Sequence, residues 1–215
     1  MISPKLIRGG IILLDAQTSA VLRVVTLQYN PDSLSRTLQI KNAGGEAGDH
    51  VEVTRLKGPP VETIKLEAEI DATDQLEFPE QNQTAVEVGI HPQLAALETV
   101  IYPTSAQLQS NNTLAQSGTL EIAPMEAPLT LFVWSKNRIL PVRLTEFSIT
   151  EEAFDPSLNP VRAKVSLGMR VLNVNDLGFG HKGGSLFMIY QQQKEQLAKK
   201  NPNGTLGALG LGSIP

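Results

Sequence analysis

The stretch FDPSLNPVRAKVSLGMRVLNV, residues 154 to 174, decides the fold, because apolar and polar residues alternate along it. Apolar side chains occupy every second position from Val161 to Val171, and the positions between them hold Arg, Lys, Ser and Gly. Successive side chains of a strand point to opposite faces of a sheet, so this pattern predicts a half-buried strand. Eleven residues at roughly 3.3 Å each span about 36 Å, nearly twice the length of a usual strand.

Several stretches before this strand also predict β-structure. Residues 11–14 and 20–29 are rich in Val and Leu and flank the turn-forming segment DAQTS, so they predict a hairpin. Another strand is expected at about residues 37–41, followed by a Gly-rich segment at 42–50 that we expect to be mobile. Residues 61–71, VETIKLEAEID, alternate in the same way as the first stretch and predict a second long strand.

The second half of the chain mixes helix and strand signals. HPQLAALETVIYP, residues 91–103, places apolar residues at helical spacing between two prolines and predicts a helix. LTLFVWS, residues 129–135, is apolar on both faces, as expected of a strand covered on both sides. In residues 138–154 the alternation slips by one position, which predicts a strand with a β-bulge near Thr145 or Glu146.

The order of these elements predicts an α+β fold with mainly antiparallel β-structure. At least six strands, with one helix inserted before the later ones, favour either a barrel or two packed sheets. A second helix is expected in SLFMIYQQQKEQLAKK, residues 185–200, and would flank the sheet. Residues 201–215 are Gly-rich with spaced Leu residues, so we expect a flexible C-terminal tail.

Composition excludes several classes of function. Of the 215 residues, 41% are apolar and 19% are charged, which is typical of a globular protein. The net charge of -4 gives no electrostatic reason to expect nucleic acid as a partner. The chain has no cysteine, and its N-terminal apolar stretch is too short for a membrane span and lacks a cleavage site. We therefore expect a protein without a signal peptide or membrane anchor that is made in the cytoplasm.

No motif in the sequence predicts an enzyme. GFGHKG, residues 178–183, matches a dinucleotide-binding loop, but no second parallel strand with an acidic residue follows, so a flexible connection is the better interpretation. His50, His91 and His181 lie in separate segments without the spacing of metal ligands. We therefore expect no catalytic residues, no metal and no cofactor.

Two turns of related sequence stand out as candidate docking elements. YNPDSLSR begins with Tyr29, Asn30 and Pro31, and FDPSLNPVR begins with Phe154, Asp155 and Pro156. In each, an Asx side chain can bond to the turn that it opens, and Pro fixes the next φ, so each predicts a stiff corner beside an aromatic residue. Two interpretations stay open. The corners only connect strands as stable turns, or they also dock a neighbouring subunit.

The polar faces of the two long strands carry opposite charges. Arg162, Lys164 and Arg170 lie on one strand, and Glu67, Glu69 and Asp71 lie on the other. Like charges along one strand repel, and opposite charges across strands or across a subunit boundary relieve this repulsion by about 0.2 to 1 kcal/mol per pair. We expect these faces to meet, within one subunit or between neighbours. The candidate protein-interface residues are therefore Tyr29, Asn30, Pro31, Glu67, Glu69, Phe154, Asp155, Pro156, Arg162, Lys164 and Arg170.

The sequence resembles a family of structural proteins over roughly residues 10–195. The resemblance rests on LQYNPDSLSR, on HPQLAALETVIYP and on the continuous segment from PLTLFVW through FDPSLNPVR to VLNV with the helix after it. These segments are similar to the tube-like domain of contractile injection systems, the phage-tail-like particles. The match is to the tube adaptor near the baseplate, in which this domain often precedes a LysM module.

The resemblance implies a split β-barrel with flanking helices, occupying residues 1–200, and a tail at 201–215. It also implies that copies, with six expected, close into a homo-oligomeric ring that joins the inner tube protein to the spike and baseplate wedge proteins. Long strands would then extend past the core of one subunit so that neighbouring sheets join, which also hides sheet edges. Assembly is expected in a bacterial or archaeal cytoplasm, before the subunit becomes part of the particle. No LysM module is expected, because the sequence ends at Pro215.

Two other functions compete with this interpretation. A stand-alone β-sandwich that binds a carbohydrate or a small ligand would need an exposed aromatic platform, but the chain has one Trp and three Tyr, and Trp134 lies in a strand expected to be buried. A nucleotide-dependent enzyme would depend on the glycine-rich segment alone. We therefore favour a structural ring subunit over both alternatives.

Overall fold

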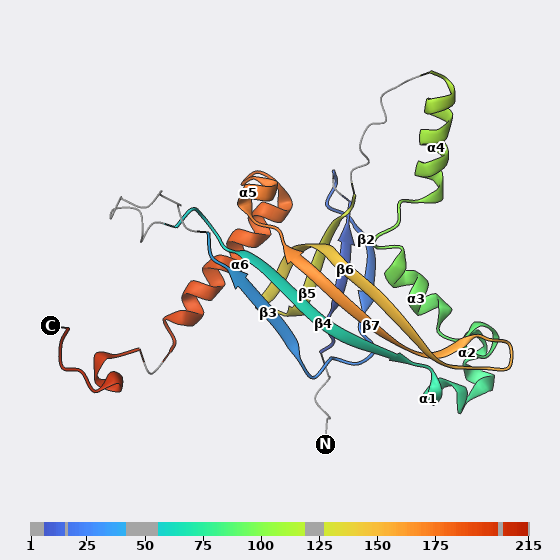
Figure 1. Ribbon diagram of the computed structural model, residues 1–215, viewed down its shortest axis with the longest axis horizontal. Coiled ribbons are helices and arrows are strands. Elements are labelled where there is room, and N and C mark those ends of the chain that lie inside the picture. Colours follow the sequence, from blue (N-terminus) through green and yellow to red (C-terminus); the bar gives the residue numbers. More distant parts are fainter. Residues whose placement is uncertain (1–6, 16, 42–55, 119–126, 202–203, 215) are drawn as a thin grey trace, which may run out of the picture.

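A single antiparallel sheet of seven strands organises the protein in its computed structural model (Figure 1). The structure describes residues 7–15, 17–41, 56–118, 127–201 and 204–214. The strand order is β2-β1-β5-β6-β7-β4-β3. The strands are β1 Gly10–Leu14, β2 Val21–Thr26, β3 Leu34–Gln39, β4 Val61–Asp71, β5 Leu129–Ser135, β6 Arg138–Phe154 and β7 Pro160–Val171.

The sheet does not close into a barrel within the described residues. The α+β class with mainly antiparallel strands is confirmed, but one open sheet replaces both expected alternatives, the closed barrel and the two packed sheets. The edges of the sheet are β2 and β3, and no ladder joins them. Instead, helix α3 lies beside the opening, and its Leu94 and Leu97 pack into the same core as Val25 and Ile70.

The two predicted long strands are confirmed. Strand β4 spans the predicted residues 61–71, and β7 buries alternate positions from Ala163 to Val171. The predicted slip in β6 is also confirmed, because the pairing with β7 shifts between Leu144 and Glu146. This bulge places Glu146 so close to Gly168 that a Cβ there would lie 2.6 Å from the Cβ of Glu146. Glycine is therefore the residue that fits opposite the bulge.

The shorter predicted elements are confirmed with shifted ends. The first hairpin is β1–β2, and β5 covers residues 129–135 as predicted. The strand expected at 37–41 is β3, Leu34–Gln39. It begins earlier than expected because its pairing with β4 starts directly after the corner that precedes it. The Gly-rich segment at 42–50 lies outside the described residues.

Helices cover parts of the sheet and extend from it. The helix predicted at 91–103 is α3, and the one predicted at 185–200 is α6, which begins and ends a few residues earlier. The helical elements are α1 Thr73–Leu76, η1 Pro79–Gln81, α2 Gln83–Val88, α3 His91–Glu98, α4 Ser105–Gln116, α5 Val174–Leu177, α6 Lys182–Ala198 and η2 Leu206–Leu209. Six of them, α1, η1, α2, α4, α5 and η2, are not predicted from apolar spacing. Helix α4 has no buried residue, although its Thr104–Gln107 capping box is a sequence signal for its start.

The core lies on the face of the sheet that α3 and α6 cover. Its fully buried side chains include Ile64 of β4, Phe132 of β5, Leu140 of β6 and Val165 of β7. Phe187 and Tyr190 of α6 belong to the same cluster. Among the described residues, no helix combines the length and the apolar character that crossing a membrane requires.

Candidate subunit interface

The residues that the sequence singles out for an interface lie in three places. Six of them line one groove of about 390 Å³ between the first corner and the polar face of the sheet: Tyr29, Asn30, Pro31, Glu67, Glu69 and Lys164. Arg162 lies beside them, 3.7 Å from the carboxylate of Glu69. The second corner, residues 154–156, lies at the tip of the β6–β7 hairpin, and Arg170 lies toward the other end of β7.

The first corner is tied to distant backbone. The Asn30 side chain accepts a hydrogen bond from the Gly9 amide at 2.9 Å and donates one to the Ile7 carbonyl at 2.8 Å. The side chain of Gln28, just before the corner, bonds to both the amide and the carbonyl of Asp71, at 3.0 and 2.6 Å. These bonds hold the chain that crosses from β2 to β3, and they leave Tyr29 exposed.

The second corner is held mainly by its own side chains. Asp155 Oδ1 accepts hydrogen bonds from the amides of Ser157 and Asn159, at 2.7 and 2.8 Å, and Oδ2 accepts one from Asn159 Nδ2. The hydrogen bonds from the side chain and amide of Asn159 hold the pKa of Asp155 below its ordinary value. The Asn159 side chain also donates a hydrogen bond to the Glu87 carbonyl, so the corner is bonded to α2. Phe154 is exposed.

The opposite charges of the long strands meet within the subunit in part. Arg162 pairs with Asp71 at 2.7 Å, in line with the sequence-based expectation. Lys164 and Arg170 pair instead with acids outside the predicted set, Glu152 and Asp176 respectively. These side chains are partly exposed, so each pair contributes at most about 1 kcal/mol.

Asp71 is the point where both corners connect. Its backbone binds Gln28 next to the first corner, and its carboxylate binds Arg162, which follows the second. Partial burial works against the charge of Asp71, but hydrogen bonds from Thr73 and Arg162 outweigh it and hold its pKa below the ordinary value. In turn, the hydrogen bond and charge of Asp71 raise the pKa of Arg162.

Sequence analysis missed the apolar residues at the two edges of the sheet. Strand β2 is exposed along nearly its whole length and presents Val21, Leu22 and Val24 to solvent. At the opposite edge, Leu38 of β3 and Ile40 after it are exposed as well. The sequence did contain a signal for the exposed apolar edge at β2. Apolar and polar residues do not alternate in AVLRVVT, as they would in a strand with one solvated face. Each edge strand pairs with one neighbour only.

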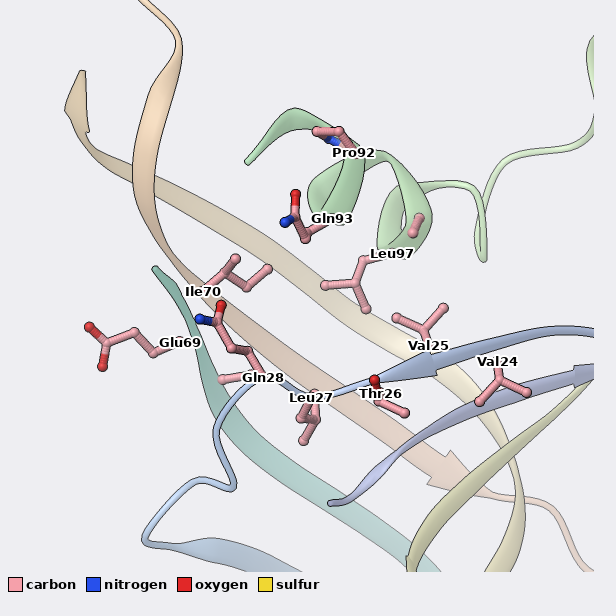
Figure 2. Close-up of a pocket in the computed structure, with 12 residues that line it drawn as sticks. Val24, Val25, Thr26, Leu27, Gln28, Glu69, Ile70, Pro92, Gln93 and Leu97 are labelled. Carbon is pink, nitrogen blue, oxygen red and sulfur yellow. The ribbon is translucent and has the colours of Figure 1, made fainter. Parts of the chain in front are cut away.

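A cavity of about 280 Å³ lies at the opening of the sheet (Figure 2). Its walls come from β2, from the end of β4 and from α3, with Val25, Ile70 and Leu97 among the apolar lining residues. Gln93 of α3 lines it too, and its Oε1 atom is buried without a hydrogen-bond partner among the described residues. The cavity lies between β2 and the end of β4, the part of that strand that extends past its pairing with β3.

A buried ion pair fixes α6 to the sheet. Glu62 is on the apolar face of β4 and only 4% exposed, and it pairs with Arg36 of β3 at 2.6 Å. Arg36 also donates to the hydroxyl of Tyr190 in α6 at 3.0 Å. Burial, and then the charge of Glu62, raise the pKa of Tyr190. Removing one partner would leave a buried charge uncompensated, which costs several kcal/mol.

The glycine-rich segment and the histidines take structural positions. His181 caps α6, since its Nδ1 accepts from the Gly183 amide, and His91 is exposed at the start of α3. A Cβ on Gly184 would lie 1.9 Å from the Gly178 carbonyl oxygen, so close backbone packing explains the glycine spacing. His50 lies outside the described residues, and within those residues no cluster of His, Asp and Glu could hold a metal ion.

Comparison with known proteins identifies a family. The family model described as "Contractile injection system tube protein" matches residues 13–173, which is most of the chain and includes the last two residues of β1 and every strand after it. A search of curated proteins found no match.

Solved structures show weak similarities. One is described as the virion of a native gene transfer agent particle, with 11% identity and a TM-score of 0.27, and the match covers 76% of this chain and 90% of that one. Another is the tail of an empty gene transfer agent particle with C6 symmetry, with 12% identity, a TM-score of 0.28 and the same coverage. At these TM-scores the similarity supports no conclusion about fold or function.

Proposed function

The chain belongs to the contractile injection system tube protein family, and on that premise we propose that its copies close into a ring of six that joins the inner tube to the spike and baseplate. The family is one of structural tube proteins and not an enzyme family. The protein therefore works as a part of a phage-tail-like particle, in contact with other tail components. The six-fold ring and the position next to spike and baseplate wedge proteins are our proposal.

The observation that carries the ring is the pair of open edges on one sheet. Strands β2 and β3 lie at opposite ends of the strand order, and both edges expose apolar side chains. An exposed apolar edge strand is a template for pairing with another chain, and natural monomers protect such edges. If β2 of one subunit meets β3 of the next, each edge is covered and the sheets continue around a closed ring.

The long strands favour the same proposal. Strand β6 has 17 residues and β7 has 12, and their hairpin extends past the end of β5 (Figure 1). The hairpin buries alternate residues of β7 within the subunit but has no buried residue in β6 from 143 to 154. We propose that it contributes to a wall that several subunits share, with residues 1–200 as the tube domain and 201–215 as a tail outside it.

The ring can be tested with substitutions at the β2 edge. Leu22→Lys with Val24→Lys places two charges on the exposed edge, so we expect the particle mass in light scattering to fall from about six subunits to one. As a matched control, Phe179→Lys with Leu209→Lys adds the same charges at exposed apolar residues outside the sheet edges and should leave the mass unchanged. Negative-stain images should show rings for the wild type and the control.

A ring can require a neighbouring ring as a template, so the measurement includes co-expression with the inner tube protein of the same particle. A wild-type chain that stays monomeric both alone and in co-expression contradicts the ring. Saturable binding of a sugar by such a monomer would favour a carbohydrate-binding module instead.

A further inference from the structure

Charge is distributed unequally between the two ends of the molecule. The sequence has no Lys or Arg between Lys65 and Lys136, and this region supplies α1, η1 and α2. Helix α6 and the turn after it hold the opposite charge, with Lys182, Lys194, Lys199 and Lys200 against a single acid, Glu195. Helices α1 and α2 lie at one end of the long axis of the molecule, and α6 lies toward the other (Figure 1).

The surface of α1, η1 and α2 combines this negative charge with exposed apolar side chains. We name it the acidic surface, and its apolar residues are Phe78, Val86 and Val88, of which Phe78 is 57% exposed. No described cation forms an ion pair with the acids around them, which are Asp74, Glu77, Glu80 and Glu87.

The exposed side of α6 has the matching composition. We name it the basic surface, and it consists of Ile189 and Leu197, both about half exposed, with Lys199 and Lys200 at the end of the helix. Residues 189 and 197 are eight positions apart, which is about 80° around the helix, so both can belong to one apolar stripe. Neither Lys199 nor Lys200 forms an ion pair with a described acid.

We propose that the acidic surface of one subunit docks on the basic surface of a second copy of this chain. An apolar centre inside a polar rim is the usual composition of a protein interface, and opposite potentials on the two sides steer and orient the partners. The two surfaces differ and lie at opposite ends, so the contact is head to tail. Contacts of this kind generate rings or stacked filaments and not closed dimers. The inference rests on the proposed function, since it names a contact between subunits of the tube.

Charge reversal at each surface tests the inference. Glu77→Lys, Glu80→Lys and Glu87→Lys leave one acid against three lysines and so make both surfaces of the subunit positive. Lys199→Glu with Lys200→Glu makes both surfaces negative. For each variant alone we expect the apparent Kd of self-association, measured by sedimentation equilibrium at low salt, to rise by about tenfold or more. All five residues are exposed, so the thermal unfolding of each variant should stay close to that of the wild type.

A mixture of the two variants gives the decisive measurement. The basic surface of the first variant still fits the acidic surface of the second, and their reversed surfaces fit each other. We therefore expect an equimolar mixture to recover the wild-type assembly, with the two variants alternating around an even-numbered ring. Arg8→Glu with Arg143→Glu is the matched control for the Lys199→Glu and Lys200→Glu variant, because it lowers the net charge by the same amount at exposed residues outside both surfaces and should leave association unchanged.

The outcomes separate this inference from the ring itself. Wild-type association that survives both reversals overturns the head-to-tail contact and leaves the ring standing. Loss of association in both variants without recovery in the mixture also overturns it, because complementary surfaces must restore each other. A wild type that does not associate, alone or in co-expression with the inner tube protein, overturns the contact and the ring together.

Discussion

The two Asx-Pro corners share a sequence pattern but hold different parts of the molecule. Asn30 uses its amide to bind the backbone of Ile7 and Gly9, more than twenty residues away in the chain. Asp155 uses its carboxylate to bind residues within its own turn, Ser157 and Asn159. The same Asx-Pro sequence pattern therefore makes long-range hydrogen bonds in the first corner and local hydrogen bonds in the second.

The strands that each corner connects explain the difference. The second corner joins β6 and β7, which are neighbours in the sheet, so the turn needs only to hold itself. The first corner carries the chain from β2 to β3, the two opposite edges, and has no adjacent ladder for support. An ionised carboxylate can only accept, whereas the Asn30 amide both donates to the Ile7 carbonyl and accepts from the Gly9 amide group, as this crossing requires.

The largest expected effect on stability comes from a substitution at Gly89, where the chain after α2 packs against the second corner. Gly89, after α2, has φ +57, and a Cβ there would lie 2.2 Å from the Pro160 carbonyl oxygen. Gly89→Ala should therefore lower the free energy of unfolding by at least about 2 kcal/mol, measured by urea denaturation. Gly178→Ala is the matched control, since its φ is +72 but nothing lies within 4 Å of the added Cβ. Equal losses of unfolding free energy in both variants would show that the clash with the Pro160 carbonyl does not contribute to the effect of Gly89→Ala.

Next in size is the exchange of the two Asx residues. Asn30→Asp replaces a donor by a charged acceptor that faces the Ile7 carbonyl, so we expect a loss of about 1 to 3 kcal/mol in the free energy of unfolding. Asp155→Asn keeps the oxygen that accepts from both amides, so its loss should be smaller. If the two exchanges cost the same in urea denaturation, the corners do not differ as their hydrogen bonds indicate.

The pH dependence of stability should separate the corners further, with a smaller effect. The pKa of Asp155 is lowered in the folded state, so its carboxylate contributes stability above its ordinary pKa of 3.8, and this contribution is lost as the pH falls through the lower folded value. The difference in Tm between wild type and Asp155→Asn should therefore narrow as the pH falls from 7 to 3. The difference between wild type and Asn30→Ala should not narrow in this way, because an amide does not titrate in this range.

The smallest effect on stability is expected at the aromatic residue that begins each corner. Tyr29 and Phe154 are 44% and 52% exposed, so replacing either by Ala should change the free energy of unfolding by only about 0.5 kcal/mol. Light scattering then distinguishes the two open interpretations of the corners. Loss of assembly at unchanged stability indicates that a corner docks a neighbour, and unchanged assembly indicates a hairpin corner only.

Much of the local structure followed from the sequence because side-chain alternation is a local property. It predicted β4, β7, the bulge in β6 and the helices α3 and α6, since each is decided by the pattern within its own segment. It did not predict α4, which has no buried residue and whose start is marked only by its capping box. The six interface candidates that share one groove could be selected by type, but their meeting depends on the register between β4 and β7.

The sequence by itself determined the family, the long strands and the opposite charges of their polar faces. Only the tertiary structure decided that the sheet stays open, that β2 and β3 are its edges, that Glu62 is buried with Arg36 and that Asn30 and Asp155 have different partners. The physical reason is the range of the interactions. Periodicity acts between residues a few positions apart, whereas strand order and hydrogen-bond partners depend on contacts between segments that the chain brings together only when it folds.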